Sequence, residues 1–300
     1  QKPQTDFLER GADVLISTPG RMFDLRSQGF LDLGKVEILV LDEADHMLAL
    51  GFIRDIRDVL RRLPRKHQTL FFSATINEEI KDLAYSIVRN PIRIQVSPKD
   101  RVSKNVNHQV AFVAMDDKRF FLERIIKEQE TSRFLVFVRT KVRAERVAAA
   151  MLRVGIETLT MHGDKAQEDR LSVMEKFKSG AVRVLIATDI SARGIDISGV
   201  QYVVNYDLPD EPENYVHRVG RTGRGMEKGF AISFCSEEEK PVLDQIQGFL
   251  GKEIQVLEID KELYQMTMAL TEEPNTNWRK LIADDEAEKA LRRKKKGKKK

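Results

Sequence analysis

The segment EILVLDEAD, residues 37–45, is an apolar run that ends in closely spaced carboxylates. A continuous run of Ile, Leu and Val is typical of a strand that is buried on both faces of a parallel sheet. Side chains that follow such a strand lie at the carboxyl edge of the sheet, where α/β folds bind their ligands. The segment therefore predicts a buried strand that places Asp42, Glu43 and Asp45 at a functional edge.

Apolar runs of this kind alternate with helical patterns along most of the chain, which predicts an α/β fold of parallel sheets with helices on both faces. Helical periodicity is clear at residues 145–155 and 169–180. The strands that we expect lie at residues 12–18, 37–45, 69–75, 92–96, 133–140, 158–164, 183–189, 202–207 and 229–234. The polar side chains that follow these runs are Asp42, Ser73, Arg139, His162, Thr188 and Asp207. Their positions predict one functional edge for each sheet.

A polar stretch that contains proline, QVSPKDRVSKNVNHQ at residues 95–109, separates the first four expected strands from the last five. Such a composition is typical of a linker between two domains. We therefore expect a first domain at residues 1–96, a linker at 97–107, a second domain at 108–260, and an extension with a lysine-rich tail at 261–300.

The net charge of +4 comes from one end of the chain. Residues 292–300, RRKKKGKKK, carry eight cations, so the rest of the chain has a net charge of 4 − 8 = −4. A block of like charges is typically disordered and attracts polyanions such as nucleic acid. A solvated tail without a dedicated role is the alternative.

The composition also bears on the cellular compartment. No apolar run reaches the ~18 residues that a membrane-spanning helix needs. The chain contains one cysteine, Cys235, so an intrachain disulfide is excluded, as in proteins of a reducing compartment. We therefore expect a cytoplasmic protein without a membrane partner.

The carboxylates that follow the quoted strand suit phosphate chemistry. Asp42 at the strand tip can hold Mg²⁺ through water, because that ion keeps much of its hydration shell. Glu43 is placed to orient or deprotonate a water molecule that attacks a phosphate. Ser73 and Thr75, at the end of the next expected strand, can donate hydrogen bonds to Asp45 or Asp42. An acidic helix N-cap and local caps by the two hydroxyls are the alternatives.

The segment HRVGRTGRG, residues 217–225, spaces arginines by three and surrounds them with glycine. A helix expected within residues 207–220 ends at the first glycine, so Arg221 and Arg224 emerge from a loop. A planar guanidinium can bind a phosphate at two points. The loop therefore predicts a phosphate contact, and a solvated basic turn is the alternative.

The segment ATDISARGIDI, residues 187–197, follows another apolar run. Thr188 and the neighbouring backbone amides are placed to bind a nucleic-acid phosphate. Asp196 is placed to accept a hydrogen bond from a ribose hydroxyl. This segment therefore predicts contacts with a nucleotide or a nucleic acid at the second sheet.

Taken together, these segments resemble the motifs of DEAD-box RNA helicases, in the order of that family and over residues 5–260. Seven ordered motifs make the resemblance specific, and the compact second domain and lysine tail are similar to the bacterial RhlE-like subgroup. The resemblance implies two RecA-like parallel-sheet domains in tandem, the first incomplete, with a disordered basic C-terminal tail. The motifs are TPGR (18–21), DEAD (42–45), SAT (73–75), VFVRT (136–140), HGD (162–164), ATDISARGID (187–196) and HRVGRTGR (217–224).

The resemblance implies an ATP-dependent RNA helicase that uses Mg²⁺ and unwinds short duplexes, or remodels RNA–protein complexes, by closing its domains on ATP. It implies that Asp42, Glu43, Arg221 and Arg224 serve the ATP phosphates and that Asp196 contacts the ribose. Residues implied to couple the ATP state to the RNA state are Asp45, Ser73, Thr75 and His217. Residues implied to line a path for the RNA backbone and 2′-hydroxyls, without base reading, are Thr18, Pro19, Gly20, Arg21, Arg139, Gly163, Gln167, Arg170 and Thr188.

The chain departs from the family because it contains no GxxxxGK[ST] phosphate loop and no adenine-reading glutamine segment. We expect both to lie upstream of Gln1, so that the chain is part of a longer helicase and binds ATP poorly. An ATPase-deficient RNA-binding or annealing fragment is therefore the alternative function. A related DNA helicase is a third, which the DEAD, SAT and HRVGRTGR segments disfavour. The tail is a candidate contact for ribonucleoprotein partners.

Overall fold

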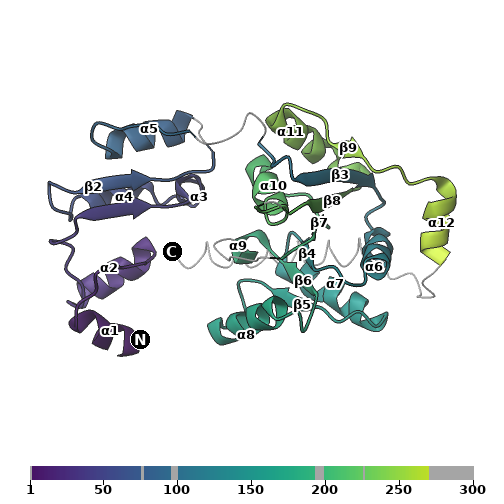
Figure 1. Ribbon diagram of the computed structural model, residues 1–300, viewed down its shortest axis with the longest axis horizontal. Coiled ribbons are helices and arrows are strands. Elements are labelled where there is room, and N and C mark those ends of the chain that lie inside the picture. Colours follow the sequence, from purple (N-terminus) through teal and green to yellow (C-terminus); the bar gives the residue numbers. More distant parts are fainter. Residues whose placement is uncertain (1, 76–77, 96–100, 193–198, 226, 270–300) are drawn as a thin grey trace, which may run out of the picture. The chain divides into compact units, whose positions relative to one another are not determined.

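The computed structural model describes residues 2–75, 78–95, 101–192, 199–225 and 227–269. The chain divides into two compact units, Gln1–Val96 and Ser97–Lys300, both of which are drawn in Figure 1. Both units combine helices with parallel strands, so the predicted α/β fold class is confirmed. Among the described residues, no helix is both long enough and apolar enough to span a membrane.

The first unit contains a two-stranded parallel sheet in which β1 and β2 pair from Ile38–Gln68 to Leu41–Phe71. Its core includes Leu41 on β1, Ile56 on α4 and Leu83 on α5, which pack against one another because α4 and α5 each turn an apolar side toward the sheet. The elements in chain order are α1 (Lys2–Glu9), α2 (Pro19–Ser27), β1 (Ile38–Leu41), α3 (Ala44–Ala49), α4 (Ile53–Leu60), β2 (Gln68–Phe71) and α5 (Glu78–Ile87).

Two expected strands of the first unit are wrong. Residues 12–18 and the described part of 92–96 form no ladder, and their apolar side chains are exposed, with Ile16 at 94% and Ile92 at 88%. A strand needs a neighbour to accept and donate its backbone hydrogen bonds. An apolar run reveals the tendency to be buried in a sheet, but it does not reveal whether a neighbouring strand is present.

The second unit is built on a seven-stranded, fully parallel sheet in the order β5-β6-β4-β7-β8-β3-β9. The five strands expected in this part of the chain are all present as β4 to β8. The elements are β3 (Val106–Phe112), α6 (Lys118–Glu128), β4 (Phe134–Phe137), α7 (Lys141–Arg153), β5 (Leu159–Met161), α8 (Gln167–Lys178), β6 (Val184–Ala187), α9 (Asp189–Ala192), β7 (Tyr202–Asn205), α10 (Pro212–Val219), β8 (Gly229–Cys235), η1 (Glu237–Glu239), α11 (Lys240–Leu250), β9 (Gln255–Val256) and α12 (Lys261–Ala269).

Both faces of the second sheet are covered. On one face Leu135 of β4 belongs to an apolar cluster with Phe177 of α8 and Tyr215 of α10. On the other face Val136 of the same strand belongs to a cluster with Phe121 of α6 and other side chains of α6 and α7. Alternate residues of one strand therefore reach two separate cores, which is why the strand is apolar along its whole length.

The structure extends the second unit beyond the sequence-based expectation at both ends. β3 begins at Val106, so the strand occupies the end of the expected 97–107 linker. After residue 260, where we expected only an extension, α12 packs on α6. The Tyr264 hydroxyl donates to Asp117 Oδ2 at 2.6 Å, and the Tyr264 ring lies 5.0 Å from that of Phe121. The expected lysine-rich tail lies outside the described residues.

Candidate functional site

The carboxylates that follow β1 differ in what they contact. Asp42 is exposed, and its Oδ1 accepts a hydrogen bond from the Glu43 backbone N–H at 2.9 Å. Glu43 occupies the N-cap position of α3 in a left-handed conformation, with φ 50° and ψ 47°, and its side chain makes no capping hydrogen bond. A non-glycine residue with positive φ is uncommon and is found preferentially at functional sites. The acidic N-cap alternative therefore does not explain the Glu43 carboxylate.

Asp45 connects the DEAD and SAT segments of the first unit. Its Oδ2 accepts hydrogen bonds from both the backbone N–H and the Oγ1 of Thr75, each at 2.9 Å, while Oδ1 accepts from the His46 N–H at 2.9 Å. The expected bond from a SAT hydroxyl to Asp45 is therefore confirmed for Thr75. The expectation is wrong for Ser73, whose Oγ donates to the Thr75 carbonyl at 2.6 Å instead.

The TPGR segment begins α2. Thr18 is the N-cap residue and Pro19 the first helical residue, where the missing N–H of proline does no harm. An added Cβ at Gly20 would meet no atom within 4 Å, so the backbone there is open to approach. Arg21 donates to Asp24 Oδ2 at 2.5 Å and to Gln4 Oε1 at 2.8 Å. Its guanidinium is thus held at the surface by partners on two helices.

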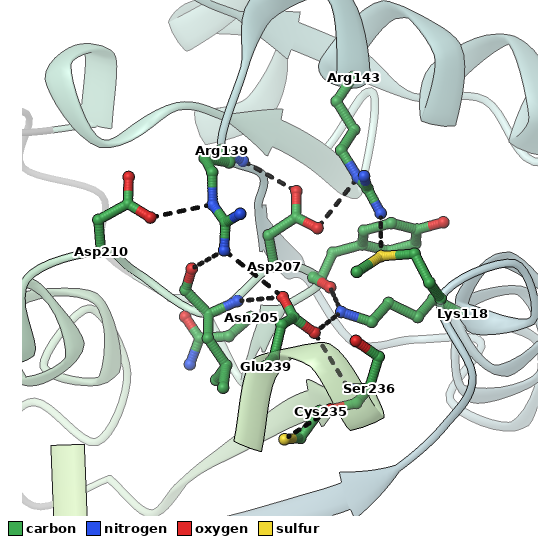
Figure 2. A network of polar contacts seen from close by, with 12 residues as sticks. Lys118, Arg139, Arg143, Asn205, Asp207, Asp210, Cys235, Ser236 and Glu239 are labelled. Atoms are coloured by element: carbon green, nitrogen blue, oxygen red, sulfur yellow. Dashed lines mark hydrogen bonds and ion pairs between the residues drawn. The ribbon is translucent and has the colours of Figure 1, made fainter. Parts of the chain in front are cut away.

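In the second unit, Arg139 follows β4 and lies among carboxylates (Figure 2). Its backbone N–H donates to Asp207 Oδ2 at 2.9 Å, its Nε lies 3.1 Å from Asp210 Oδ1, and its Nη2 lies 3.7 Å from Glu239 Oε1. The other Asp207 oxygen pairs with Arg143 Nε at 3.0 Å. Four residues that follow strands were expected at this edge: Arg139, His162, Thr188 and Asp207. Asp207 follows β7 and accepts a hydrogen bond from Arg139, which follows β4, so this contact joins the ends of the two strands.

Beneath Arg139 is a buried ion pair that sequence analysis missed. The Lys118 ammonium is fully buried, pairs with Glu239 Oε2 and donates to the Tyr206 carbonyl at 2.9 Å. Glu239 Oε2 also accepts from the Ser236 N–H at 3.0 Å. Figure 2 shows Lys118 and Arg139 approaching Glu239 from different elements. Such a pair is tolerated in the interior because additional hydrogen bonds satisfy both partners.

Burial also shifts the pKa values of side chains around this network. Burial raises the pKa of the Cys235 thiol to about 11, and the Glu239 carboxylate acts in the same direction. Burial raises the pKa of Tyr206 further above its usual range, against the neighbouring Arg143 cation. Both groups therefore stay neutral near pH 7.

His162 and Gly163 follow β5. His162 Nε2 lies 2.7 Å from Glu145 Oε1, which also accepts from Thr160 Oγ1 at 2.7 Å. Burial by itself raises the pKa of the Glu145 carboxyl, but the hydrogen bonds from Thr160 and His162 hold it below its usual range. An added Cβ at Gly163 would meet open space, so the backbone after this anchored histidine is accessible.

Two further predicted RNA contacts lie on α8, which begins at Gln167. Arg170 Nη1 lies 3.5 Å from Gln167 Oε1, one turn away. On the neighbouring strand, Thr188 follows β6, and its Oγ1 lies 3.0 Å from Ser191 Oγ. Asp196, predicted to contact the ribose, lies outside the described residues.

Arg218 is the largest fully buried side chain of the chain's described part, and sequence analysis assigned it no role. Its Nε and Nη2 pair with the two Asp189 oxygens at 2.6 and 2.7 Å, and its Nη1 donates to the Asp207 carbonyl at 2.7 Å. The guanidinium also lies over the Phe137 ring, 5.0 Å from its centroid. Arg218 thereby ties α10 to the ends of β4, β6 and β7.

The arginine loop begins where α10 ends at Val219, as the glycines predict. Arg221 Nε donates to the His217 carbonyl and Arg224 Nε to the Gly220 carbonyl, both at 3.3 Å. Thr222 is buried between them, and its Oγ1 donates to the Val200 carbonyl at 2.6 Å. The loop is therefore anchored at its centre, with one arginine on each side of the anchor.

Two glycines allow the loop to pass close to the sheet. An added Cβ at Gly223, which has φ +66°, would lie 2.5 Å from Val106 Cγ2. An added Cβ at Gly229 would lie 2.1 Å from Thr222 Oγ1. Any side chain at either position would displace the loop and with it the two arginines.

Comparison with known proteins identifies the family of this arrangement. Residues 1–83 match the model of the DEAD/DEAH box helicase domain, and residues 117–226 match that of the helicase conserved C-terminal domain. A structure of S. cerevisiae Dbp5 bound to RNA and ADP BeF3 is 33% identical, covers 86% of this chain and 69% of its own, and superposes with a TM-score of 0.76. The chain belongs to the DEAD-box RNA helicase family.

Other DEAD-box relatives agree. A DEAD box protein from Methanococcus jannaschii is 35% identical over 82% of this chain and 67% of its own, with a TM-score of 0.51. The ATP-dependent RNA helicases RhlB of Shewanella frigidimarina and Shewanella amazonensis are 40% and 38% identical over 86% of this chain. The chain spans about 60% of the length of these curated DEAD-box relatives.

Proposed function

We propose that the chain is the part of an ATP-dependent RNA helicase that carries the hydrolytic carboxylates, the arginine fingers and much of the RNA path. The observation that supports this most directly is the division of roles among the DEAD carboxylates. Asp45 is engaged with Thr75, whereas Asp42 is exposed and Glu43 is held in a left-handed conformation with no capping bond. The relatives named ATP-dependent RNA helicases support the same activity.

The residues present suit Mg²⁺ and the ATP phosphates. Asp42 is exposed at the end of β1, which suits an ion held largely through water by a single carboxylate. When bound, Mg²⁺ would offset the negative charge that ATP brings to the reacting phosphate. Glu43 would orient or deprotonate the attacking water.

Arg221 and Arg224 would bind the ATP phosphates from the second unit, and Asp196 the ribose. An arginine finger contributes on the order of 10³ to 10⁵ in rate because it stabilises charge on the transferring phosphoryl group. The anchored loop supports this role, since Thr222 holds both arginines at fixed points of the backbone. Hydrolysis would then require the two units to close on ATP.

The RNA path would consist of surfaces on both units. Gly20, next to Arg21 in the sequence, and Gly163 leave open backbone, which suits a phosphodiester chain that makes no base contacts. Dbp5, solved bound to RNA, supports this ligand. The other residues proposed to contact RNA are Thr18, Pro19, Gln167, Arg170 and Thr188.

Coupling between ATP and RNA would pass through Asp45, Ser73, Thr75 and His217. The Asp45–Thr75 contact gives this proposal its physical basis, because it joins the segment that would act on ATP to the end of the neighbouring strand. Closing on both ligands would bend the RNA strand and separate a short duplex, and hydrolysis would release it.

The subgroup, the cellular location and the partners of the protein are also proposals. The bacterial RhlE-like subgroup is one, although both Shewanella relatives carry the name RhlB. A cytoplasmic location and ribonucleoprotein partners of the tail are others. An ATPase-deficient RNA-binding or annealing function is a second candidate, favoured by one sequence feature: no GxxxxGK[ST] segment occurs in the chain.

RNA-stimulated ATP hydrolysis by the chain, with Glu43→Gln beside it, tests the proposal. At ATP concentrations high enough to offset the poor ATP binding expected without a GxxxxGK[ST] segment, we expect turnover that depends on RNA and falls by about 10² to 10⁴ in the variant, as for removal of a general base. Glu37→Gln, an exposed carboxylate at the other end of β1, is the matched control and should retain turnover. RNA binding without any ATP turnover would favour the annealing alternative.

A further inference from the structure

The first unit carries a concentration of exposed positive charge away from the DEAD and SAT segments. Arg54, Arg57 and Arg61 lie on one side of α4, because spacings of three and four residues return to the same face of a helix. The turn from α4 into β2 adds two exposed cations, and the end of α5 adds another. The members of this basic surface are Arg54, Arg57, Arg61, Arg65, Lys66 and Arg89.

The turn within the basic surface is built by specific contacts. His67 Nδ1 lies 2.6 Å from the Pro64 carbonyl, and Arg89 Nη1 donates to the Arg65 carbonyl at 3.0 Å. The second contact places the Arg89 guanidinium against the backbone of Arg65, 24 residues away in the chain. Like charges repel when placed together, so a cluster of this kind has a physical reason to bind an anion.

Only some cations of the basic surface make contacts that stabilise the first unit. Arg61 pairs with Asp58 Oδ1 at 2.9 Å, and Arg89 supports the turn. Arg57, Arg65 and Lys66, by contrast, have no ion pair with any carboxylate of the residues that the structure describes. The carboxylates of α4 and of the turn that follows it are Asp55 and Asp58. α4 and this turn thus carry five exposed cations and two carboxylates, in a chain whose net charge without residues 292–300 is −4.

The turn within the basic surface lies at the opposite edge of the β1–β2 sheet from the proposed hydrolytic residues. β1 and β2 are parallel, and Asp42 and Ser73 follow their carboxyl ends. The turn with Arg65 and Lys66 leads into the amino end of β2, at the tails of the two arrows in Figure 1. Four-residue strands at ~3.3 Å per residue separate the two edges by about 13 Å.

The chemistry of the basic surface fits a phosphodiester backbone better than a protein. A protein interface needs a buried apolar centre surrounded by polar residues. No large apolar side chain of α4, or of the turn that follows it, is among the strongly exposed ones in the described part of the chain. Tyr85 on α5 is 53% exposed and lies four residues before Arg89, where an aromatic ring can stack on a base.

We propose that the basic surface is an accessory RNA-binding site that grips the phosphates of a strand beyond the segment held at the carboxyl edge. Five of its six cations are arginines, whose planar fork matches phosphate. The site would add affinity that depends on salt and not on sequence, because it holds only backbone charge. This inference rests on the proposed RNA-helicase function and adds to it a second point of contact.

RNA affinity measured as a function of salt tests the site. The variant Arg57→Gln/Arg65→Gln/Lys66→Gln removes three exposed cations that make no ion pair with a described carboxylate. At ~0.7 per phosphate contact on a single strand, the slope of log affinity against log salt should fall by about 2, and affinity at ~0.15 M salt should fall roughly 10- to 50-fold. Arg10→Gln/Arg26→Gln/Lys35→Gln, with the same exposed residue types in the same unit, should change neither.

The outcomes separate this inference from the function on which it rests. ATP turnover at saturating RNA should stay unchanged in the Arg57 triple variant, because the DEAD, SAT and TPGR segments are intact. If the wild-type chain binds RNA and the triple variant binds equally well with the same salt slope, the accessory site is wrong and an acidic protein partner becomes the better candidate. If the control variant loses as much affinity, the effect is general charge and the accessory site is wrong. If the wild-type chain does not bind RNA, the proposed function fails and the site with it.

Discussion

In the first unit, Asp42 and Glu43 follow a strand whose Ile38 and Val40 are 55% and 53% exposed, whereas in the second unit β4 and β6 are buried along their whole length. The difference extends to the polar side chains. The first unit holds Asp45 by hydrogen bonds from Thr75 near the surface, and the second holds its edge by ion pairs of the buried Arg218 and Lys118. The buried ions of the second unit are tolerated because their mutual attraction and additional hydrogen bonds offset their desolvation.

The largest effect should follow from removing Arg218. Arg218→Met leaves Asp189 without its partner and the Asp207 carbonyl without a donor, so the second unit should lose about 3–5 kcal/mol of its free energy of unfolding. Hydrogen exchange of the second unit's amides in urea measures this loss separately from the first unit. Arg221→Met is the control and should stay within ~0.5 kcal/mol. Equal stability of both variants would show that the buried pairs do not distinguish the two units.

A smaller effect is expected in the first unit from Thr75→Val. The variant removes the bond from Oγ1 to Asp45 but keeps the bond from the backbone N–H, so local stability should fall by about 1 kcal/mol. Hydrogen exchange of the amides around residue 45 measures it. Ser73→Ala, which removes only a bond to a neighbouring carbonyl, should have less effect. A larger loss in Ser73→Ala would contradict the assignment of Asp45–Thr75 as the link between the two segments.

The smallest expected effect is on how the stability of the second unit depends on pH. His108 lies 2.9 Å from the Tyr215 hydroxyl, and burial, together with the Lys252 cation, holds its pKa below the ordinary 6.5. The unfolded chain therefore binds a proton that the folded chain does not, and stability should fall as pH decreases from about 6.5 toward the lowered pKa. His108→Gln should flatten this slope for the second unit and leave that of the first unchanged. An unchanged slope in the variant would rule out His108 as its origin.

Sequence patterns predicted the second sheet well because burial on both faces leaves a visible mark. β4 and β6 are short, continuous runs of apolar residues, and β5, β7 and β8 each contain one polar residue, a pattern consistent with strands that are buried on both faces. β3 was missed because three consecutive polar residues, Asn107, His108 and Gln109, interrupt it in a stretch that also resembles a linker. Residues 12–18 were assigned wrongly because a pattern cannot reveal a missing neighbour.

The candidate site divides in the same way. Residues that follow a strand, such as Asp42 and Arg139, could be placed from the sequence, because chain direction alone fixes which edge of a parallel sheet they reach. Arg218, Lys118 and Glu239 could not, because charged residues are rarely buried and only tertiary packing shows that these are. The sequence did contain one indication that Arg218 is buried. It lies one helical turn after Tyr215 and therefore on the same, buried side of α10.

The order of strands in the second sheet has a consequence for how the protein is made. β3 is synthesised first among its strands, yet it pairs with β8 over seven residues and with β9, which are synthesised last. At ~5–20 residues per second, a ribosome takes on the order of 10 s to reach β8 after completing β3. During that interval Val110 and Phe112 have no strand beside them. A nascent chain with such an edge depends on chaperones or on rapid local collapse, so mutations that slow translation within residues 113–228 should lower its yield without changing the finished fold.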